Sequence, residues 1–139
     1  MPLIKITIGQ HVLKARMEDQ KAPRTCEAFL RHLPLSSRLI QARWSGEAAW
    51  IPMGSADFGV GHENPTSYPA PGQILLYPGG LSETEILLPY GATAFASKVG
   101  MLAGNHFLTV VEGQEILERI GKLVLWEGAQ DITFEAVDR

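Results

Sequence analysis

The carboxylates that are the best candidates for a chemical role lie in the middle of the chain. Glu83 and Glu85 are two residues apart, so on a strand they would share a face, where like charges repel unless water or a cation surrounds them. Arg38, Arg43 or Lys98 could supply that cation. Glu85 precedes the apolar run ILLP, which favours a partly buried carboxylate able to act as a base or to anchor a ligand. Glu85 is therefore a candidate catalytic residue.

The stretch GMLAGNHF, residues 100–107, places an amide and an imidazole beside two glycines. Glycine lets the backbone approach a ligand closely, and histidine titrates near neutral pH. Asn105 is therefore a candidate ligand-binding residue, and His106 is a candidate catalytic residue that could move protons together with Glu85. A tight turn with a structural hydrogen bond from His106 is the alternative interpretation.

Arg43 and Trp44 put a guanidinium beside an indole, a pair that could grip a carboxylate and stack on a flat group. Tyr77 and Tyr90 flank the Glu85 segment and could reach a ligand with their hydroxyl groups. Packing in the core or at its rim is the alternative for the aromatic residues. Together with Glu85, Asn105 and His106, these residues predict one cleft of mixed polarity for a small polar or anionic metabolite.

Several classes of partner are disfavoured. The four histidines and the single Cys26 show no metal-site spacing, so we expect no metal and no cofactor. A net charge of −3 gives no basic field for nucleic acid. The N-terminus lacks a signal-peptide pattern and no apolar run is long enough to cross a bilayer, so we expect a cytoplasmic protein without a membrane partner. A homo-oligomer is a reasonable expectation because symmetric assemblies are common.

Short strands must position these residues. Apolar alternation predicts strands at residues 3–8 and 12–17. Short stretches rich in apolar or aromatic residues predict further strands at 38–44, 47–51, 73–77, 83–88, 123–126 and 132–137. An apolar stripe predicts a helix from Pro23 to Pro34 with an inert, buried Cys26, and a second helix spans residues 113–120 and stops at Gly121. Residues 53–72, rich in glycine and proline, predict a long loop that could serve as a lid.

The length of 139 residues fits one domain covering residues 1–139. Many short strands with two short helices favour a mainly β fold, a closed or nearly closed antiparallel barrel capped by the two helices.

Two stretches carry a family resemblance. DQKAPRTCEAFLRHLP, residues 19–34, resembles the helix entry of cyclophilins, and TVVEGQEILERIGK, residues 109–122, resembles their second helix entry. The segments YPGGLSETEILLPYG and FASKVGMLAGNHF are similar to a group of bacterial cyclophilin-like proteins of unknown function. The resemblance implies a cyclophilin-like barrel.

True cyclophilins isomerise prolyl peptide bonds with an arginine that donates to the amide nitrogen. The resemblance carries Arg38 over as that arginine, but Arg43 and Gly46 then stand where the family has a phenylalanine and a glutamine, which spoils the apolar slot for the proline ring. Three functions stay open: a metabolite-binding protein with unproven catalysis, a prolyl isomerase that uses Arg38, and a non-catalytic subunit or interaction module.

Overall fold

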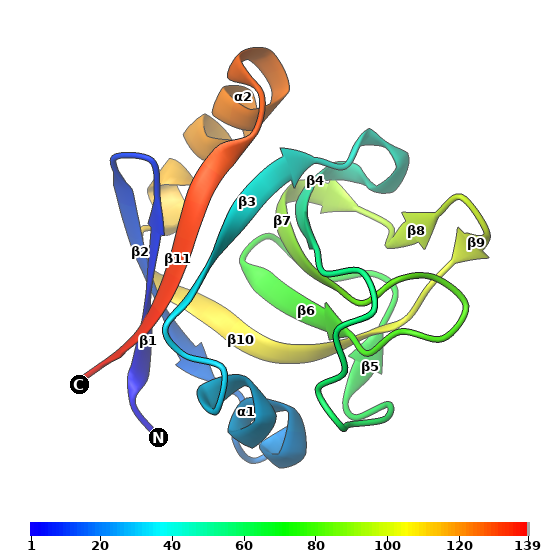
Figure 1. The fold of residues 1–139 in the computed structure, drawn as a ribbon. Coiled ribbons are helices and arrows are strands. Elements are labelled where there is room, and N and C mark those ends of the chain that lie inside the picture. The colour runs from blue at the N-terminus through cyan, green and yellow to red at the C-terminus, as the bar shows by residue number, and fades with distance from the viewer. Residues whose placement is uncertain (139) are drawn as a thin grey trace.

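A computed structural model describes residues 1–138, and within them eight antiparallel strands close into a barrel (Figure 1). Around the barrel the strands run β2 (His11–Met17), β1 (Leu3–Ile8), β11 (Gln130–Val137), β3 (Leu35–Gln41), β4 (Gly46–Pro52), β7 (Glu85–Thr93), β6 (Gln73–Tyr77) and β10 (Gly104–Glu112). The barrel closes because β10 pairs with β6 on one side and with β2 on the other. The predicted closed antiparallel barrel is confirmed.

The two helices of the described chain lie at opposite ends of the barrel, α1 (Pro23–Leu30) at one and α2 (Leu117–Glu127) at the other (Figure 1). Pro23 begins α1, where its missing N–H is no loss. Phe29 of α1 packs edge-to-face on Phe107 and Phe134, with ring centroids 5.0 and 5.3 Å apart. Cys26 is buried as predicted, and burial, with Asp19 nearby, raises the pKa of its thiol to about 12. Within residues 1–138 neither helix is long and apolar enough to span a membrane.

Side chains alternate between two apolar clusters on the two faces of the barrel wall. Ile86 and Leu88 of β7 belong to the large cluster inside the barrel, whereas Leu87 between them belongs to a smaller cluster on the opposite face. Phe95 and Leu102 of that second cluster lie directly before and after a short hairpin of β8 (Ala96–Ser97) and β9 (Gly100–Met101). The smaller cluster consists of Ala42, Ala48, Leu75, Tyr77, Leu87, Phe95 and Leu102. The outer face of the wall is therefore partly a second core.

One predicted strand is too long and another is wrong. The strand expected at residues 38–44 ends at Gln41, and Arg43–Ser45 forms the short 3-10 helix η1, in which Ser45 N–H donates to the Ala42 carbonyl at 3.0 Å. The strand expected at residues 123–126 is the last part of α2, which follows the 3-10 helix η2 (Gln114–Ile116). Gly121 does not end α2 but lies inside it. The missing side chain leaves room for Tyr90 of β7, which packs against the helix at this point.

That packing predicts a steric cost for Gly121→Ala. A Cβ at this position would lie 2.1 Å from the Tyr90 ring, which is itself held by a 2.9 Å hydrogen bond from its hydroxyl to Gln41 Oε1. We expect the variant to lose about 1–3 kcal/mol of unfolding free energy in urea, although alanine favours helices. In the control Gly61→Ala the added Cβ has nothing within 4 Å, and the change should stay within about 0.5 kcal/mol. Equal stability of both variants would contradict the packing argument.

Candidate functional site

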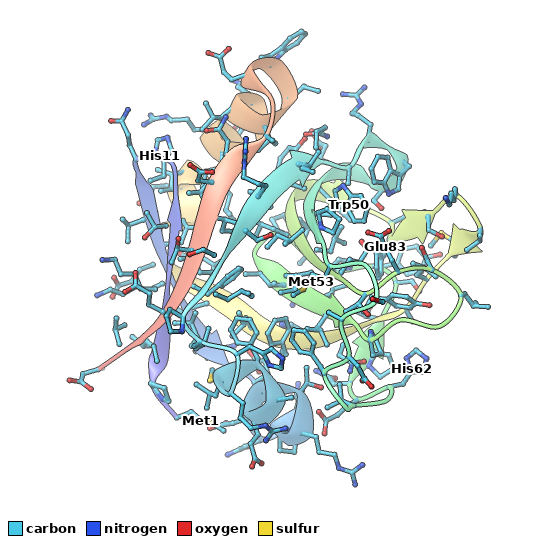
Figure 2. The ribbon with its side chains drawn as sticks, in the orientation of Figure 1. Met1, His11, Trp50, Met53, His62 and Glu83 are labelled. Atoms are coloured by element: carbon cyan, nitrogen blue, oxygen red, sulfur yellow. The ribbon has the colours of Figure 1, made fainter. Side chains whose placement is uncertain are left out.

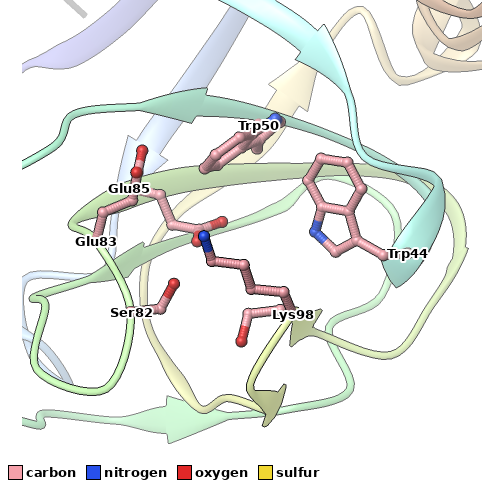
Figure 3. A pocket seen from close by; sticks show the side chains of 7 residues that line it. Trp44, Trp50, Ser82, Glu83, Glu85 and Lys98 are labelled. Atoms are coloured by element: carbon pink, nitrogen blue, oxygen red, sulfur yellow. The ribbon is translucent and has the colours of Figure 1, made fainter.

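A pocket of about 290 Å³ lies on the outer face of the barrel wall, beside the β8–β9 hairpin (Figure 3). β4 and β7 supply its wall, the loop before β7 its floor, and the hairpin its far side. The lining residues are Trp44, Trp50, Ser82, Glu83, Glu85, Ser97 and Lys98. Two indoles and two carboxyl groups thus meet one ammonium group in a small space.

The two tryptophans form the apolar side of the pocket. Trp44 comes from η1 and Trp50 from β4, and their rings pack edge-to-face with centroids 5.4 Å apart. Half of Trp44 is exposed, whereas the Trp50 N–H is buried and has no hydrogen-bond partner among residues 1–138. Such a corner of indole faces suits a flat or apolar part of a ligand.

Glu85 is the most unusual group in the pocket. It is the first residue of β7 and only 2% exposed, and its Oε1 atom has no hydrogen-bond partner in the described chain. Burial raises the pKa of Glu85 to about 8, and the charge of Glu83 adds to the shift. The carboxyl group is therefore mostly protonated at neutral pH. A buried polar group gains free energy when it forms a hydrogen bond, so this oxygen is a point at which a ligand can bind.

Lys98 gives the pocket its positive charge. Figure 3 shows its side chain extending from the hairpin towards the glutamate side of the pocket. The ion pairs of residues 1–138 join other side chains, so Lys98 is not paired within 4.0 Å to Glu83 or Glu85. The sequence indicated Lys98 only as a possible partner for the two glutamates, and no sequence pattern marked Trp50, Ser82 or Ser97 as site residues.

Of the predicted site residues, only Trp44 and Glu85 line the pocket described above. Arg43 and Tyr90 line a different pocket, beside α2. Tyr77 lies in the outer apolar cluster, where its hydroxyl accepts a 3.0 Å hydrogen bond from Leu81 N–H and so holds the loop before β7. The single cleft expected from sequence is thus divided between separate places.

Asn105 lies on β10 rather than in a turn, and it is fully buried. Its Oδ1 accepts a 2.9 Å hydrogen bond from Glu63 N–H, and its Nδ2 donates to the Gly61 carbonyl at 2.9 Å and to Thr25 Oγ1 at 3.2 Å. All these partners belong to the long loop or to α1. In this arrangement Asn105 joins two elements of the fold.

His106 also lies on β10, on the opposite face from Asn105. Its Nε2 is 2.7 Å from Thr109 Oγ1, which in turn donates to Glu18 Oε2 at 2.6 Å. Burial lowers the pKa of His106, with Glu18 opposing that shift. None of these three residues lines the pocket of Glu85, so Glu85 and His106 do not share a site here.

Arg38 lies on β3, where its Nε is 3.2 Å from Asp131 Oδ1 and its Nη2 donates to the Ala129 carbonyl at 3.3 Å. It is not among the residues that line the pocket. The arginine that an isomerase would need is thus engaged with the neighbouring strand and the chain before it.

The loop of residues 53–72 is attached to the barrel at several points. Its short strand β5 (Pro65–Thr66) pairs with β10, and Phe58 stacks on His32 with ring centroids 4.3 Å apart. Glu63 caps α1 by accepting hydrogen bonds from Thr25 N–H and Oγ1 at 2.8 and 2.7 Å. Burial alone would raise the pKa of Glu63, but these hydrogen bonds outweigh it and lower the pKa. The loop supplies no residue to the pocket of Glu85.

The described residues contain no group of three or more His, Cys, Asp or Glu side chains that could hold a metal ion. Figure 2 shows two of the histidines far apart, His11 on the β1–β2 hairpin and His62 in the long loop, while Trp50 and Glu83 lie on the same side of the barrel.

Comparison with known proteins gives a family and a fold. The family described as "Protein of unknown function (DUF3830)" matches residues 4–136. No curated protein matches the chain. A solved structure of McbB in complex with tryptophan is similar with a TM-score of 0.69 and 16% identity, over 98% of this chain and 45% of that one. This chain therefore spans less than half of McbB.

The solution structure of the hypothetical protein AF2241 from Archaeoglobus fulgidus is similar with a TM-score of 0.66 and 15% identity, over 98% of this chain and 95% of that one. At such low identities both likenesses concern the fold alone.

The raised pKa of Glu85 predicts a pH-dependent stability. Between about pH 4.5 and 8 the folded protein holds a proton on Glu85 that the unfolded chain releases, so stability falls as pH rises through this window. The loss reaches at most about 1.4 kcal/mol for each pH unit. Glu85→Gln removes the titration, so urea unfolding should show the variant gaining on the wild type from pH 5 to pH 8.

The control for this measurement is Glu135→Gln, which changes an exposed carboxylate on β11. Its stability should run parallel to that of the wild type at every pH. A Glu85→Gln protein that also runs parallel would show that Glu85 titrates as an ordinary carboxylate.

Proposed function

The chain belongs to the DUF3830 family, and from its site we propose that it binds a small polar metabolite in the pocket of Trp44, Trp50, Glu85 and Lys98. The observation that carries the proposal is Glu85, a carboxyl group that is 2% exposed, lines a pocket and leaves one oxygen without a partner. Such a group lowers the stability of the fold, and groups of this kind are found most often at functional sites.

The pocket matches a ligand of modest size with two unlike ends. Its volume of about 290 Å³ lies at the lower end of the range of small-molecule sites. The indoles offer contact for a flat or apolar part, and Glu85 offers a hydrogen-bonding group. Lys98 would face an anionic substituent of the metabolite.

The same site would support proton transfer if the bound metabolite reacts. A group with a pKa of about 8 is close to balanced between acid and base at neutral pH, where general acid–base catalysis is most efficient. Glu85 is the catalytic candidate in this scheme, without help from His106. Binding alone does not require turnover.

The free, buried Cys26 fits a reducing compartment such as the cytoplasm.

The proposal predicts ligand-dependent stabilisation that requires Trp44. In a thermal-shift screen of small metabolites, at least one compound should raise the Tm of the wild type by several degrees, since a ligand at 100 times its Kd adds about 2.7 kcal/mol. Trp44→Ala should weaken the binding of that compound about tenfold or more, measured by tryptophan fluorescence. Trp44 is half-exposed, so the variant should still fold.

Trp126→Ala is the matched control, because Trp126 is a more exposed tryptophan on α2 and lies outside the pocket. It should bind the compound as the wild type does. A screen without any stabilising compound, or a shift that is the same in all three proteins, would refute binding in this pocket.

An interaction role is the second candidate, and exposed apolar side chains near the pocket favour it. Leu81, Val99 and Met101 are 79%, 57% and 50% exposed, and they lie on the loop before β7 and on the β8–β9 hairpin that border the pocket. Exposed apolar residues that gather on one side of a protein often mark a contact surface. A second copy of the chain is the simplest partner for this surface.

Self-association through this surface predicts a change in mass on charge insertion. Sedimentation or light scattering should give at least a dimer for the wild type and a monomer for Met101→Lys. The control Val12→Lys changes an exposed apolar residue on β2 and should keep the wild-type mass. A wild type that is monomeric at high concentration would contradict this candidate.

A further inference from the structure

The groups around the Glu85 carboxyl determine which charge a ligand should carry there. Its carboxyl group faces Glu83 from the preceding loop, Lys98 from the hairpin and Tyr77, its register partner on β6; Pro52, its register partner on β4, is uncharged. Lys98 is not within 4.0 Å of either carboxylate, and the Tyr77 hydroxyl already accepts from Leu81 N–H. While Glu85 is protonated, the charges of Glu83 and Lys98 balance; once Glu85 ionises, negative charges outnumber positive charges two to one.

The aromatic part of the pocket has the same preference. The face of an indole ring carries the negative part of its quadrupole and attracts cations, most strongly where water is excluded. The ring planes of Trp44 and Trp50 meet at an angle of 84°, so the edge of one indole packs against the face of the other. The two rings therefore form an aromatic corner on one side of the pocket. The pocket thus combines two groups that attract an ammonium ion, an aromatic face and a carboxyl group.

We infer that the metabolite carries a protonated amine on a flat or apolar body, and that its ammonium group pairs with Glu85 while the body lies against Trp44 and Trp50. This inference rests on the proposed function and names the chemical class of its ligand. The partnerless Oε1 atom then receives an N⁺–H donor, and an anionic substituent, if the metabolite has one, faces Lys98.

Proton balance follows from this pairing. In the empty pocket at neutral pH Glu85 holds a proton, because its pKa is about 8. An ammonium group favours the carboxylate, so binding lowers that pKa and one proton passes from Glu85 to the buffer. Affinity for the amine therefore rises by up to tenfold for each pH unit. The rise stops near pH 8, where Glu85 of the ligand-free protein is itself ionised.

Three probes of one shape and different charge test the inference by calorimetry on the full chain: 2-phenylethylamine, 2-phenylethanol and 3-phenylpropionate. We expect the amine to bind the wild type at least tenfold more tightly than the other two. Titrations in buffers with different ionisation enthalpies should show release of close to one proton at pH 6.5. Glu85→Gln should abolish both the preference and the proton release, while Glu135→Gln should keep both.

Each other outcome overturns the inference in a distinguishable way. Tighter binding of 3-phenylpropionate or 2-phenylethanol, or amine binding that is unchanged in Glu85→Gln, would refute the ammonium pairing and leave binding in the pocket intact. Amine binding without proton release would refute the role of Glu85 as the ionising partner. No binding by any of the three probes would also refute the ammonium pairing. The proposed function is tested separately: it would be refuted only if the metabolite screen also gave no thermal shift that depends on Trp44.

Discussion

Closure of the barrel through β10 is the constraint on which the other features depend. This strand pairs with β2 through residues such as Leu108 and Val110 and with β6 through Asn105 and His106, and its register shifts twice along its length. Closure removes the free sheet edges and separates an inside from an outside. The inside fills with apolar side chains, so a ligand site must be built on the outer face or at an end.

The outer site exists because part of the wall is covered a second time. Phe95 and Leu102, on either side of the β8–β9 hairpin, pack with Leu75 and Leu87, which turns an exposed strand face into a small core. Gly104 allows this close packing, since a Cβ there would lie 2.9 Å from the Leu75 side chain and 3.0 Å from that of Phe95. Glu85 lies at the edge of this core, which deprives its carboxyl group of water without supplying a partner. A packing feature of the fold thus becomes an electrostatic feature of the pocket.

The partly buried carboxyl group at the end of the barrel near α1 has the opposite environment to that of Glu85. There Glu63 and Asn105 are well supplied with hydrogen bonds, and together they join the long loop, α1 and β10. The pKa of Glu63 is lowered where that of Glu85 is raised, although burial acts in the same direction on both. The difference lies in the donors that surround each carboxyl group. The loop that looked like a lid in the sequence serves to hold one end of the fold together.

The sequence by itself determined what depends on neighbours along the chain. Apolar alternation in residues 3–8 and 12–17 indicated strands of the barrel, because alternation fixes which face of a strand is apolar. The apolar stripe of the helix that begins at Pro23 indicated a buried Cys26 in the same way. Local signals failed where contacts compete, as at Gly121, which reads as a stop but packs on Tyr90 inside α2. The order ILLP after Glu85 also predicted a buried carboxylate correctly, because burial follows from its apolar neighbours.

Only the tertiary structure decided which side chains share a site. Trp44 and Glu85 meet in one pocket with Trp50 and Lys98, whereas Arg43, Asn105 and His106 are drawn into other contacts. The reason is that strand residues one apart point to opposite faces, and a shift of one residue at a bulge or a turn reverses the assignment. Spacing along the chain cannot carry that information, because it depends on how distant strands register against each other.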